Sequence, residues 1–403
     1  MGIGKKGVIR IKKRYVYNLL VILFGIIIAL IIGELSVRII APQRIYNNCT
    51  GEFEGFHEVE LNQYYGRFLK KDYRQCTVSP DNYKKIDYRT HNSLGARATY
   101  EIPYEKTEGQ KRIVLIGDSF IYGLNIDDSE TIASQLKKLL PADWEVINLG
   151  VPGFGTDQSL LLLMQEASKY KPDIVIYGLY QNDFSNNIAL YQHETYKPMF
   201  QLTENGSIVL TNYPVAKLEK KPFKPEYTGF DKFMRKYSHL WTLYQEKKGA
   251  IKALFSKPEK KDYFNSYFDS EVYSLEKNYR QNMQYAMILT LNLIKQMQIE
   301  SAKGNAEFML INFPSRLQVN PADQELLFEG YHNVDMDYFE LDKENKMMQE
   351  FAKEQNMTYI DFLPMAQQDW TKLYFRNDGH FSANGAKMIA QEIYNKMKEE
   401  RLI

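Results

Sequence analysis

The sequence predicts an α/β fold with a parallel β-sheet of about five strands and helices on both faces. Between residues 111 and 398, short apolar segments alternate with longer segments of helical periodicity. Parallel strands need crossover connections of this length, which are usually helices. The apolar segments contain few polar residues, which indicates strands that are covered on both faces of the sheet.

Each strand and helix of this prediction comes from a defined segment. Apolar, β-branched character predicts strands at residues 112–116, 144–149, 173–179, 307–313 and 358–362. Helical spacing of apolar residues predicts helices at residues 130–140, 157–170, 275–298, 342–355 and 383–398.

The composition is that of a globular protein large enough for a normal core. The 403 residues are 44% hydrophobic and 25% charged. The net charge of +1 provides no overall positive field, so we expect no nucleic-acid partner. This length allows two domains, or one large domain with insertions.

The N-terminal segment predicts a membrane anchor. Residues 1–14 contain six Lys or Arg residues and no acid, and an apolar stretch follows that extends past Glu34 to Ala41. About 20 apolar residues span a bilayer, so we expect a transmembrane helix at residues 15–40. The basic segment places the N-terminus in the cytoplasm and everything from about residue 42 outside.

A cleaved signal peptide is the alternative to this anchor. Signal peptides usually have a shorter apolar region, followed by a cleavage site of the small-x-small type. Here Glu34, Val37 and Arg38 occupy that region. We therefore favour a retained anchor in the cell membrane.

The remaining chain divides into two predicted regions. Residues 42–105 are polar and aromatic without a sustained period, which indicates a membrane-proximal region. Residues 106–403 form the predicted catalytic domain, and residues 185–275, rich in Tyr, Lys and Phe, form an insertion beside its sheet. The two cysteines, Cys49 and Cys76, would pair in an oxidising compartment, although two buried free thiols are an alternative.

Four polar segments follow predicted strands or precede the last helix. In an open parallel sheet, ligands bind at the carboxyl ends of the strands, where the topology switches. We therefore expect these segments to meet in one site, which would include residues 117–119, 148–153, 181–183 and 377–382.

Within these segments, the residue types suit nucleophilic catalysis. Ser119 needs a base, and His380 is the only one of six histidines that lies between a carboxylate and the start of an amphipathic helix. Asp378 can orient that imidazole and stabilise its protonated form. The backbone N–H groups of Ser119 and Gly153 and the side-chain amide of Asn182 would form the oxyanion hole.

The four segments resemble the sequence blocks of the SGNH hydrolases, also called GDSL-type hydrolases. The Ser, Gly, Asn and His of that name match Ser119, Gly153, Asn182 and His380, in the family's order. The resemblance spans residues 112 to about 398 and is weakest in the insertion. It implies a flavodoxin-like three-layer α/β/α fold and serine-dependent acyl transfer on oxygen esters, and it implies no metal or organic cofactor.

One position departs from the common family pattern. The family usually has an Asp three residues before the His, where this chain has Asn377, whereas Asp378 lies two residues before it. The chain is similar here to members that acylate polysaccharides, such as those resembling alginate O-acetyltransferases. If Asp378 pointed away, the site would be a Ser–His dyad.

Each candidate residue also has a structural interpretation. Ser119 and Asp118 could simply cap a helix, and Asn182 could cap a turn. Arg316, which follows another strand, could hold an anionic substrate group or form a salt bridge. The glycines at 150, 153 and 155 match neither the dinucleotide fingerprint nor a phosphate loop.

Together these features predict a membrane-anchored serine acyl-transfer enzyme that faces outward. If water resolves the acyl-enzyme, the protein is an esterase; if a sugar hydroxyl resolves it, the protein is an O-acyltransferase of cell-envelope or secreted glycans. The anchor would suit docking to an acyl-donating membrane protein. The alternative is a catalytically inactive glycan-binding or scaffold protein with the same fold.

Overall fold

The structure is a computed structural model of the whole chain. It describes residues 13–43, 45, 58–82, 84–193, 195–216, 218, 229–255, 261–262 and 270–403. Most of the predicted cytoplasmic segment 1–14 and Cys49 therefore lie outside the described residues. Cys76, on a described strand, is disulfide-bonded.

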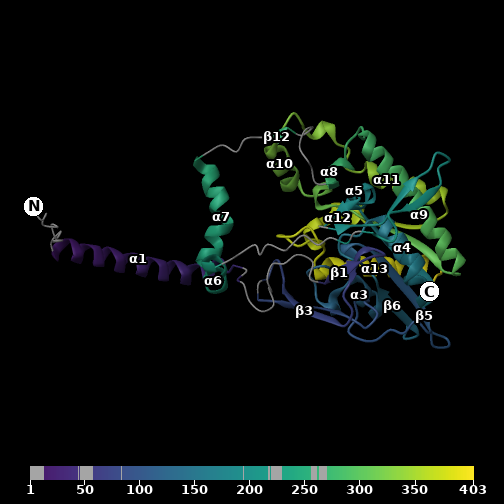
Figure 1. Ribbon diagram of the computed structural model, residues 1–403, viewed down its shortest axis with the longest axis horizontal. Coiled ribbons are helices and arrows are strands. Elements are labelled where there is room, and N and C mark those ends of the chain that lie inside the picture. The colour runs from purple at the N-terminus through teal and green to yellow at the C-terminus, as the bar shows by residue number, and fades with distance from the viewer. Residues whose placement is uncertain are drawn as a thin grey trace, which may run out of the picture. The chain divides into compact units, whose positions relative to one another are not determined.

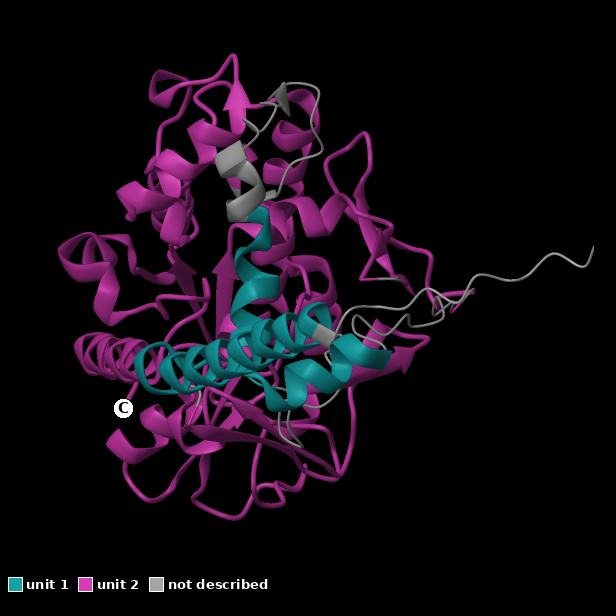
Figure 2. Cartoon of the chain, turned by 90° about the vertical axis from the view of Figure 1, so that its left-hand side faces the viewer, with its two compact units in different colours: residues 1–50, 226–257 teal, residues 51–225, 258–403 magenta. Residues whose placement is uncertain are grey.

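The chain forms two compact units, coloured separately in Figure 2. The first unit combines residues 1–50 with residues 226–257, and the second contains residues 51–225 and 258–403. Part of the predicted insertion 185–275 thus belongs to the same unit as the N-terminal helix.

A five-stranded parallel sheet is the centre of the second unit (Figure 1). Its strand order is β15-β13-β7-β5-β6, and every neighbouring pair is parallel. The strands are β5 (Lys111–Gly117), β6 (Trp144–Asn148), β7 (Ile174–Tyr180), β13 (Glu307–Phe313) and β15 (Thr358–Asp361). This order is the flavodoxin-like one, with its topological switch point between β5 and β7.

Helices cover both faces of this sheet, so the predicted fold class is confirmed. Val114 and Ile116 of β5 pack into one core with α4 (Thr156–Gln165), α9 (Gln281–Lys303) and α11 (Lys343–Glu354). Ile113 and Leu115 point to the other face and pack with α3 (Ile132–Leu139) and α13 (Ala383–Glu399). The alternation follows from the period of two along a strand.

Residues 58–105 belong to the second unit and share its core. Tyr65, Phe68, Ala96 and Ile102 lie in the same core as α4 and α9. The segment contains two antiparallel pairs, formed by β1 (Val59–Asn62), β2 (Gly66–Leu69), β3 (Tyr73–Val78) and β4 (Ile86–His91). The sequence did not predict that this segment packs into the core, because its polar, aromatic composition shows no sustained apolar period that would mark its strands.

The other elements of the second unit are short. Its helices are α2 (Ser119–Tyr122), α5 (Asn182–Ile188), α8 (Ser270–Tyr273), α10 (Pro321–Gly330) and α12 (Leu363–Asp369). Its small strands are β8 (Tyr191–Gln192), β9 (Thr195–Tyr196), β10 (Met199–Leu202), β11 (Ile208–Thr211), β12 (Lys261–Asp262) and β14 (Tyr331–His332).

The described residues of the first unit form three helices, α1 (Lys13–Ile40), α6 (Gly229–Tyr237) and α7 (His239–Phe255). Residues Arg14–Ile40 form the one described helix that is long and apolar enough to cross a membrane, by length and composition. Its large apolar side chains are exposed along its length, which is unlike the core helix of a soluble domain.

Candidate active site

The carboxyl edge of the sheet brings together the segments after β5 and β7. Ser119 is the first residue of α2, directly after β5, and Asn182 is the first residue of α5, directly after β7. Because these two strands are neighbours at the topological switch point, Ser119 and Asn182 lie at the position where ligands bind in such sheets.

Ser119, His380 and Asp378 form a continuous hydrogen-bonded chain. Ser119 Oγ lies 2.9 Å from His380 Nε2, and His380 Nδ1 lies 2.6 Å from Asp378 Oδ1. The same carboxylate oxygen accepts a hydrogen bond from the His380 backbone N–H at 2.8 Å. Asp378 therefore points toward the imidazole despite its unusual spacing in the sequence. This is the geometry of a Ser-His-Asp triad.

Two further residues hold Asp378 in place. Asn125 Nδ2 donates to Asp378 Oδ2 at 3.1 Å, and Arg316 Nη1 donates to the Asp378 carbonyl at 3.3 Å. Arg316 also forms an ion pair with Asp323 at 2.5 Å, which agrees with the salt-bridge interpretation of this residue. The arginine thereby ties the loop before His380 to the helix α10.

The electrostatics of Asp378 favour its ionised form. Burial alone raises the pKa of this carboxyl, but the hydrogen bond from His380 and the positive charges of His380 and Arg316 outweigh it. The pKa of Asp378 consequently lies below its ordinary value. An ionised carboxylate next to the imidazole is suited to stabilising the imidazolium that forms during proton transfer.

Asp118 is a helix cap and also orients Asn182. Its Oδ1 accepts from the Phe120 backbone N–H at 2.8 Å, and its Oδ2 accepts from Asn182 Nδ2 at 3.2 Å. Burial raises the pKa of Asp118, opposed by its hydrogen bond to Phe120 and by the charge of His380. An amide nitrogen has two hydrogens, so the second N–H of Asn182 can serve an oxyanion.

The loop that contains Gly153 is held by side chains from two other segments. Arg67 of β2 donates to the Pro152 carbonyl at 2.5 Å, and Gln192 of β8 donates to the Gly153 carbonyl at 3.1 Å. Gly153 has a positive φ of 75°, and a Cβ there would collide with Arg67 and His193. Glycine is therefore required at this position by both conformation and space.

Sequence reasoning missed a second group of residues that supports the α2 helix. Arg97 Nη1 donates to the Tyr122 carbonyl at 2.7 Å and also contacts the Gly123 carbonyl, while its Nη2 donates to the Ile126 carbonyl at 2.7 Å. The Arg97 side chain is almost fully buried and pairs with Asp128 at 3.2 Å. It thus satisfies the carbonyls at the end of the helix that begins with Ser119.

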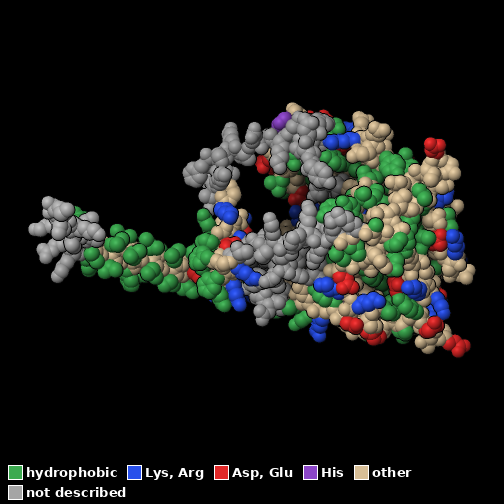
Figure 3. All heavy atoms as spheres, in the orientation of Figure 1, with side chains coloured by type: hydrophobic (Ala, Val, Ile, Leu, Met, Phe, Trp, Pro, Cys, Tyr) green, Lys and Arg blue, Asp and Glu red, His purple; other side chains and the backbone are tan. Residues whose placement is uncertain are grey.

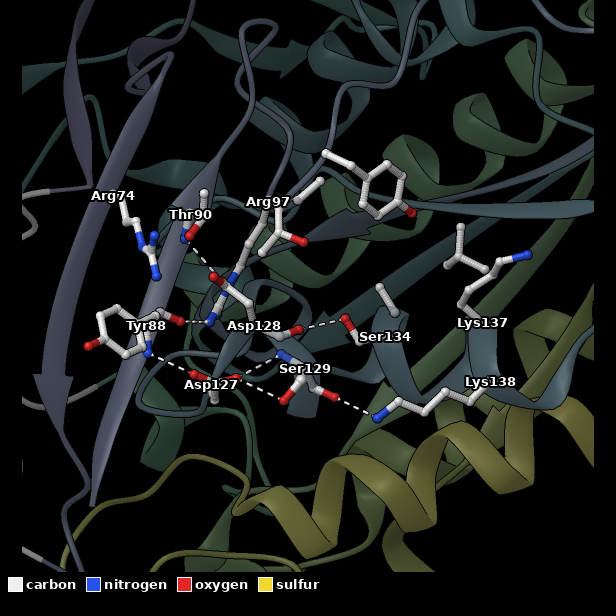
Figure 4. A pocket seen from close by; sticks show the side chains of 15 residues that line it. Arg74, Tyr88, Thr90, Arg97, Asp127, Asp128, Ser129, Ser134, Lys137 and Lys138 are labelled. Carbon is white, nitrogen blue, oxygen red and sulfur yellow. Dashed lines mark hydrogen bonds and ion pairs between the residues drawn. The ribbon is translucent and has the colours of Figure 1, made fainter. Parts of the chain in front are cut away.

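Arg97 also borders a polar pocket that is distinct from the Ser119 site. Figure 4 shows this pocket, with Arg74 and Tyr88 on one side and Lys137 and Lys138 on the other. Asp127 and Asp128 also line the pocket. Asp127 accepts a hydrogen bond from the Tyr88 backbone N–H, and Asp128 accepts one from the Thr90 backbone N–H. None of Ser119, Asp378 and His380 lines it.

The arrangement at Ser119 combines the elements of acyl transfer. The Ser119 hydroxyl has an imidazole within hydrogen-bond reach, the imidazole has an ionised partner, and the Asn182 amide is oriented by Asp118, next to Ser119 in the chain. Among the described residues, no group of three or more His, Cys, Asp or Glu residues is placed to hold a metal ion.

Comparison with known proteins gives one family match. A family model described as GDSL-like lipase/acylhydrolase matches residues 113–287. This segment contains Ser119, Gly153 and Asn182, whereas Asp378 and His380 lie beyond it. No curated protein matches the chain.

Solved structures similar to this chain include the three that follow. TesA is 11% identical, with a TM-score of 0.38, covering 72% of this chain and 99% of TesA. The esterase EstA from Pseudoalteromonas sp., inhibited by monoethylphosphonate, is 12% identical, with a TM-score of 0.37. The match covers 73% of this chain and 100% of EstA. A catalytic mutant of Axe2, an acetylxylan esterase from Geobacillus stearothermophilus, is 12% identical, with a TM-score of 0.35. The match covers 73% of this chain and 96% of Axe2.

Proposed function

We propose that this chain, whose residues 113–287 match the model of GDSL-like lipases and acylhydrolases, is an ester-acting serine hydrolase that uses Ser119 as its nucleophile. His380 is the general base, and Asp378 orients and stabilises it. The observation that carries the proposal is the hydrogen-bonded chain from Ser119 Oγ through the imidazole to the Asp378 carboxylate.

The reaction proceeds through an acyl-enzyme. Ser119 Oγ forms a bond to the acyl carbon of an ester while its proton passes to His380 Nε2. The negative charge on the former carbonyl oxygen is stabilised by Asn182 and by the backbone N–H groups of Ser119 and Gly153. The ester C–O bond then breaks, and the departing alcohol takes the proton from His380.

The second half of the reaction decides between an esterase and a transferase. Water or a sugar hydroxyl gives its proton to His380 Nε2 and forms a bond to the acyl carbon. The bond between that carbon and Ser119 Oγ then breaks, and Ser119 Oγ takes the proton back from His380. We propose O-acylated glycans of the cell envelope or secreted glycans as the substrate class. The two-residue spacing between Asp378 and His380, which resembles that of polysaccharide acetylating members, supports this choice.

We further propose that α1 anchors the enzyme in the cell membrane with the catalytic unit outside. The length and apolar character of Arg14–Ile40 support the anchor, and the basic residues before it support the orientation. A membrane protein that donates acyl groups would then be a suitable partner, because it would supply the acyl group at the same surface.

Replacement of the nucleophile tests this proposal. Ser119→Ala is expected to lower kcat for a small acyl ester by roughly 10⁴–10⁶-fold, because loss of a triad serine removes the covalent route. Ser168→Ala, at an exposed serine that precedes the amino end of β7, opposite the carboxyl edge that carries Ser119, is the matched control and should retain wild-type turnover. Equal turnover by wild type and Ser119→Ala would refute the assignment.

A further inference from the structure

An exposed aromatic face lies on the short helix α6 of the first unit. Phe230, Phe233 and Tyr237 follow the spacing i, i+3 and i+7, so they lie on the same side of the helix. They are 66%, 58% and 53% exposed. Three large aromatic side chains on one side of a nine-residue helix form an apolar surface of the kind that marks a contact site.

Two aromatic residues of α7 extend this surface. Trp241 contacts Phe230 edge-on, with 5.5 Å between the ring centroids, and Tyr244 lies 5.9 Å from Trp241. Trp241 Nε1 donates to Asp231 at 2.6 Å, which fixes the indole between the two helices. We call Phe230, Phe233, Tyr237, Trp241 and Tyr244 the aromatic collar.

The end of α1 is tied directly to this part of the chain. Glu34 of α1 accepts hydrogen bonds from the backbone N–H groups of His239 and Leu240, both at 2.9 Å, and thereby caps the first turn of α7. Arg38 donates to the Tyr237 carbonyl at 2.7 Å. The collar is therefore attached to α1 at the turn that contains Glu34 and Arg38.

This point of attachment corresponds to the surface of a bilayer. About 20 residues of helix span the hydrocarbon, so a span that begins at Tyr15 ends near Glu34. Figure 3 shows apolar side chains along α1. Residues bonded to Glu34 and Arg38 would therefore lie among the lipid headgroups.

The composition of the collar region suits that environment. Trp and Tyr are enriched at the membrane–water interface, where their rings have one apolar and one polar side. Residues 229–249 also contain five Lys or Arg residues against two acidic residues, which favours anionic headgroups. Amphipathic helices with these properties lie in the plane of the interface.

We propose that α6 and the first turns of α7 bind the lipid headgroup region of the bilayer that α1 spans. This inference rests on the proposed anchor and adds a second membrane contact to it. The collar would fix how far the span extends from the membrane and stop it from turning freely. The partner is the lipid interface itself, recognised by aromatic rings and positive charge.

Depth-dependent fluorescence quenching in the full-length chain tests this inference. The protein is placed in nanodiscs of phosphatidylcholine and phosphatidylglycerol, with a fluorescent amino acid in place of either Phe233 or Phe24. Phe24 lies in the middle of α1 and is 65% exposed. Nitroxide groups are then introduced on the headgroups or at the middle of the acyl chains.

At position 233, headgroup nitroxides should lower emission at least about twofold, and mid-chain nitroxides should have a smaller effect. At position 24, the order should be reversed. Emission at 233 that neither nitroxide changes, with position 24 quenched, would overturn the collar but leave the anchor intact. No quenching at position 24 would reject the anchor, and the collar with it.

A pair of substitutions provides the matched control. With the fluorophore at 233, Phe230→Asp should weaken quenching by headgroup nitroxides, because it places a negative charge in the aromatic face. Phe230→Leu keeps the apolar character and should retain the quenching of the parent. Identical quenching in both variants would contradict the role assigned to this face.

Discussion

Two carboxylates close to Ser119 differ in their surroundings and therefore in their roles. Burial raises the pKa of Asp118, whereas the imidazole and Arg316 bring the pKa of Asp378 below its ordinary value despite burial. Asp378 is thus the residue that remains ionised next to the base. Asp118 instead accepts a hydrogen bond from the Asn182 amide and thereby orients it.

Removal of the negative charge at Asp378 should impair catalysis without removing the nucleophile. We expect Asp378→Asn to lower kcat/KM by about 10³–10⁴-fold, because the amide no longer stabilises the imidazolium or selects its tautomer. Steady-state kinetics with a small ester give the value. Asn377→Ala, one residue earlier, should change it little; a twofold or smaller loss in Asp378→Asn would indicate a Ser–His dyad.

A buried glutamate provides a prediction about pH and stability. Burial raises the pKa of Glu344 to about 7 from an ordinary value of 4.5, with the charge of Asp361 adding to the effect. The folded chain therefore binds this proton more tightly than the unfolded chain. The contribution of Glu344 to the free energy of unfolding therefore falls as the pH rises from about 4.5 to about 7, and it stays low at higher pH.

Glu344→Gln removes this titration and keeps a similar shape. The variant should gain stability relative to wild type between about pH 4 and about pH 8, as measured by thermal unfolding at several pH values. The Asn312 side chain, which donates to Glu344 Oε1 at 2.9 Å, can donate equally to a glutamine oxygen. A stability difference that does not change with pH would disprove the assignment.

At the scale of elements, the four-residue helix α2 depends on Arg97 from a distant segment. Arg97→Ala would leave buried carbonyls and Asp128 without their partner, which should cost roughly 3 kcal/mol of unfolding free energy. It should also lower kcat more than it changes KM, because Ser119 loses its support. Thermal unfolding and steady-state kinetics provide both readouts.

Arg74→Ala is the control for this element. Arg74 lines the same pocket but is exposed, with its guanidinium over the Tyr88 ring at 4.8 Å (Figure 4). Its replacement should change stability and kcat very little. If Arg97→Ala and Arg74→Ala behave alike, Arg97 does not support the serine helix.

The strands were predictable from sequence, but some helix boundaries were not. The prediction for residues 307–313 matches β13, because a fully buried strand is a continuous apolar run. The helix predicted at 275–298 actually spans Gln281–Lys303. Leu275 instead packs with Val272 and Phe339 in a separate small cluster. Its apolar side chain happens to continue the helical spacing of the residues after Gln281, so the sequence pattern predicted a helix that begins too early.

At the scale of the whole molecule, the candidate site could be predicted because its parts follow strands of one parallel sheet. The topology brings Ser119 and His380 to one edge although 261 residues separate them. No comparable rule of topology predicts the association of Glu34 with α7. Glu34 seemed only to interrupt an apolar segment, and its bond to Leu240 spans 206 residues with no motif at either end.

The same limit explains the division of the predicted insertion. Within residues 226–257, α6 and α7 join the N-terminal helix through hydrogen bonds made by Glu34 and Arg38, which no local pattern reveals. Arg97 is a comparable case, because its partners are backbone carbonyls, which look alike at every position of a sequence.

The central claim is that Ser119 carries the acyl group, and mass spectrometry of the trapped acyl-enzyme tests it most directly. The full-length protein is mixed with an acyl donor, quenched with acid within a single turnover and digested. The acyl mass is expected on the peptide that contains Ser119 and should be absent from the same peptide of Ser119→Ala. An acyl group found on another residue, or retained in Ser119→Ala, would contradict it.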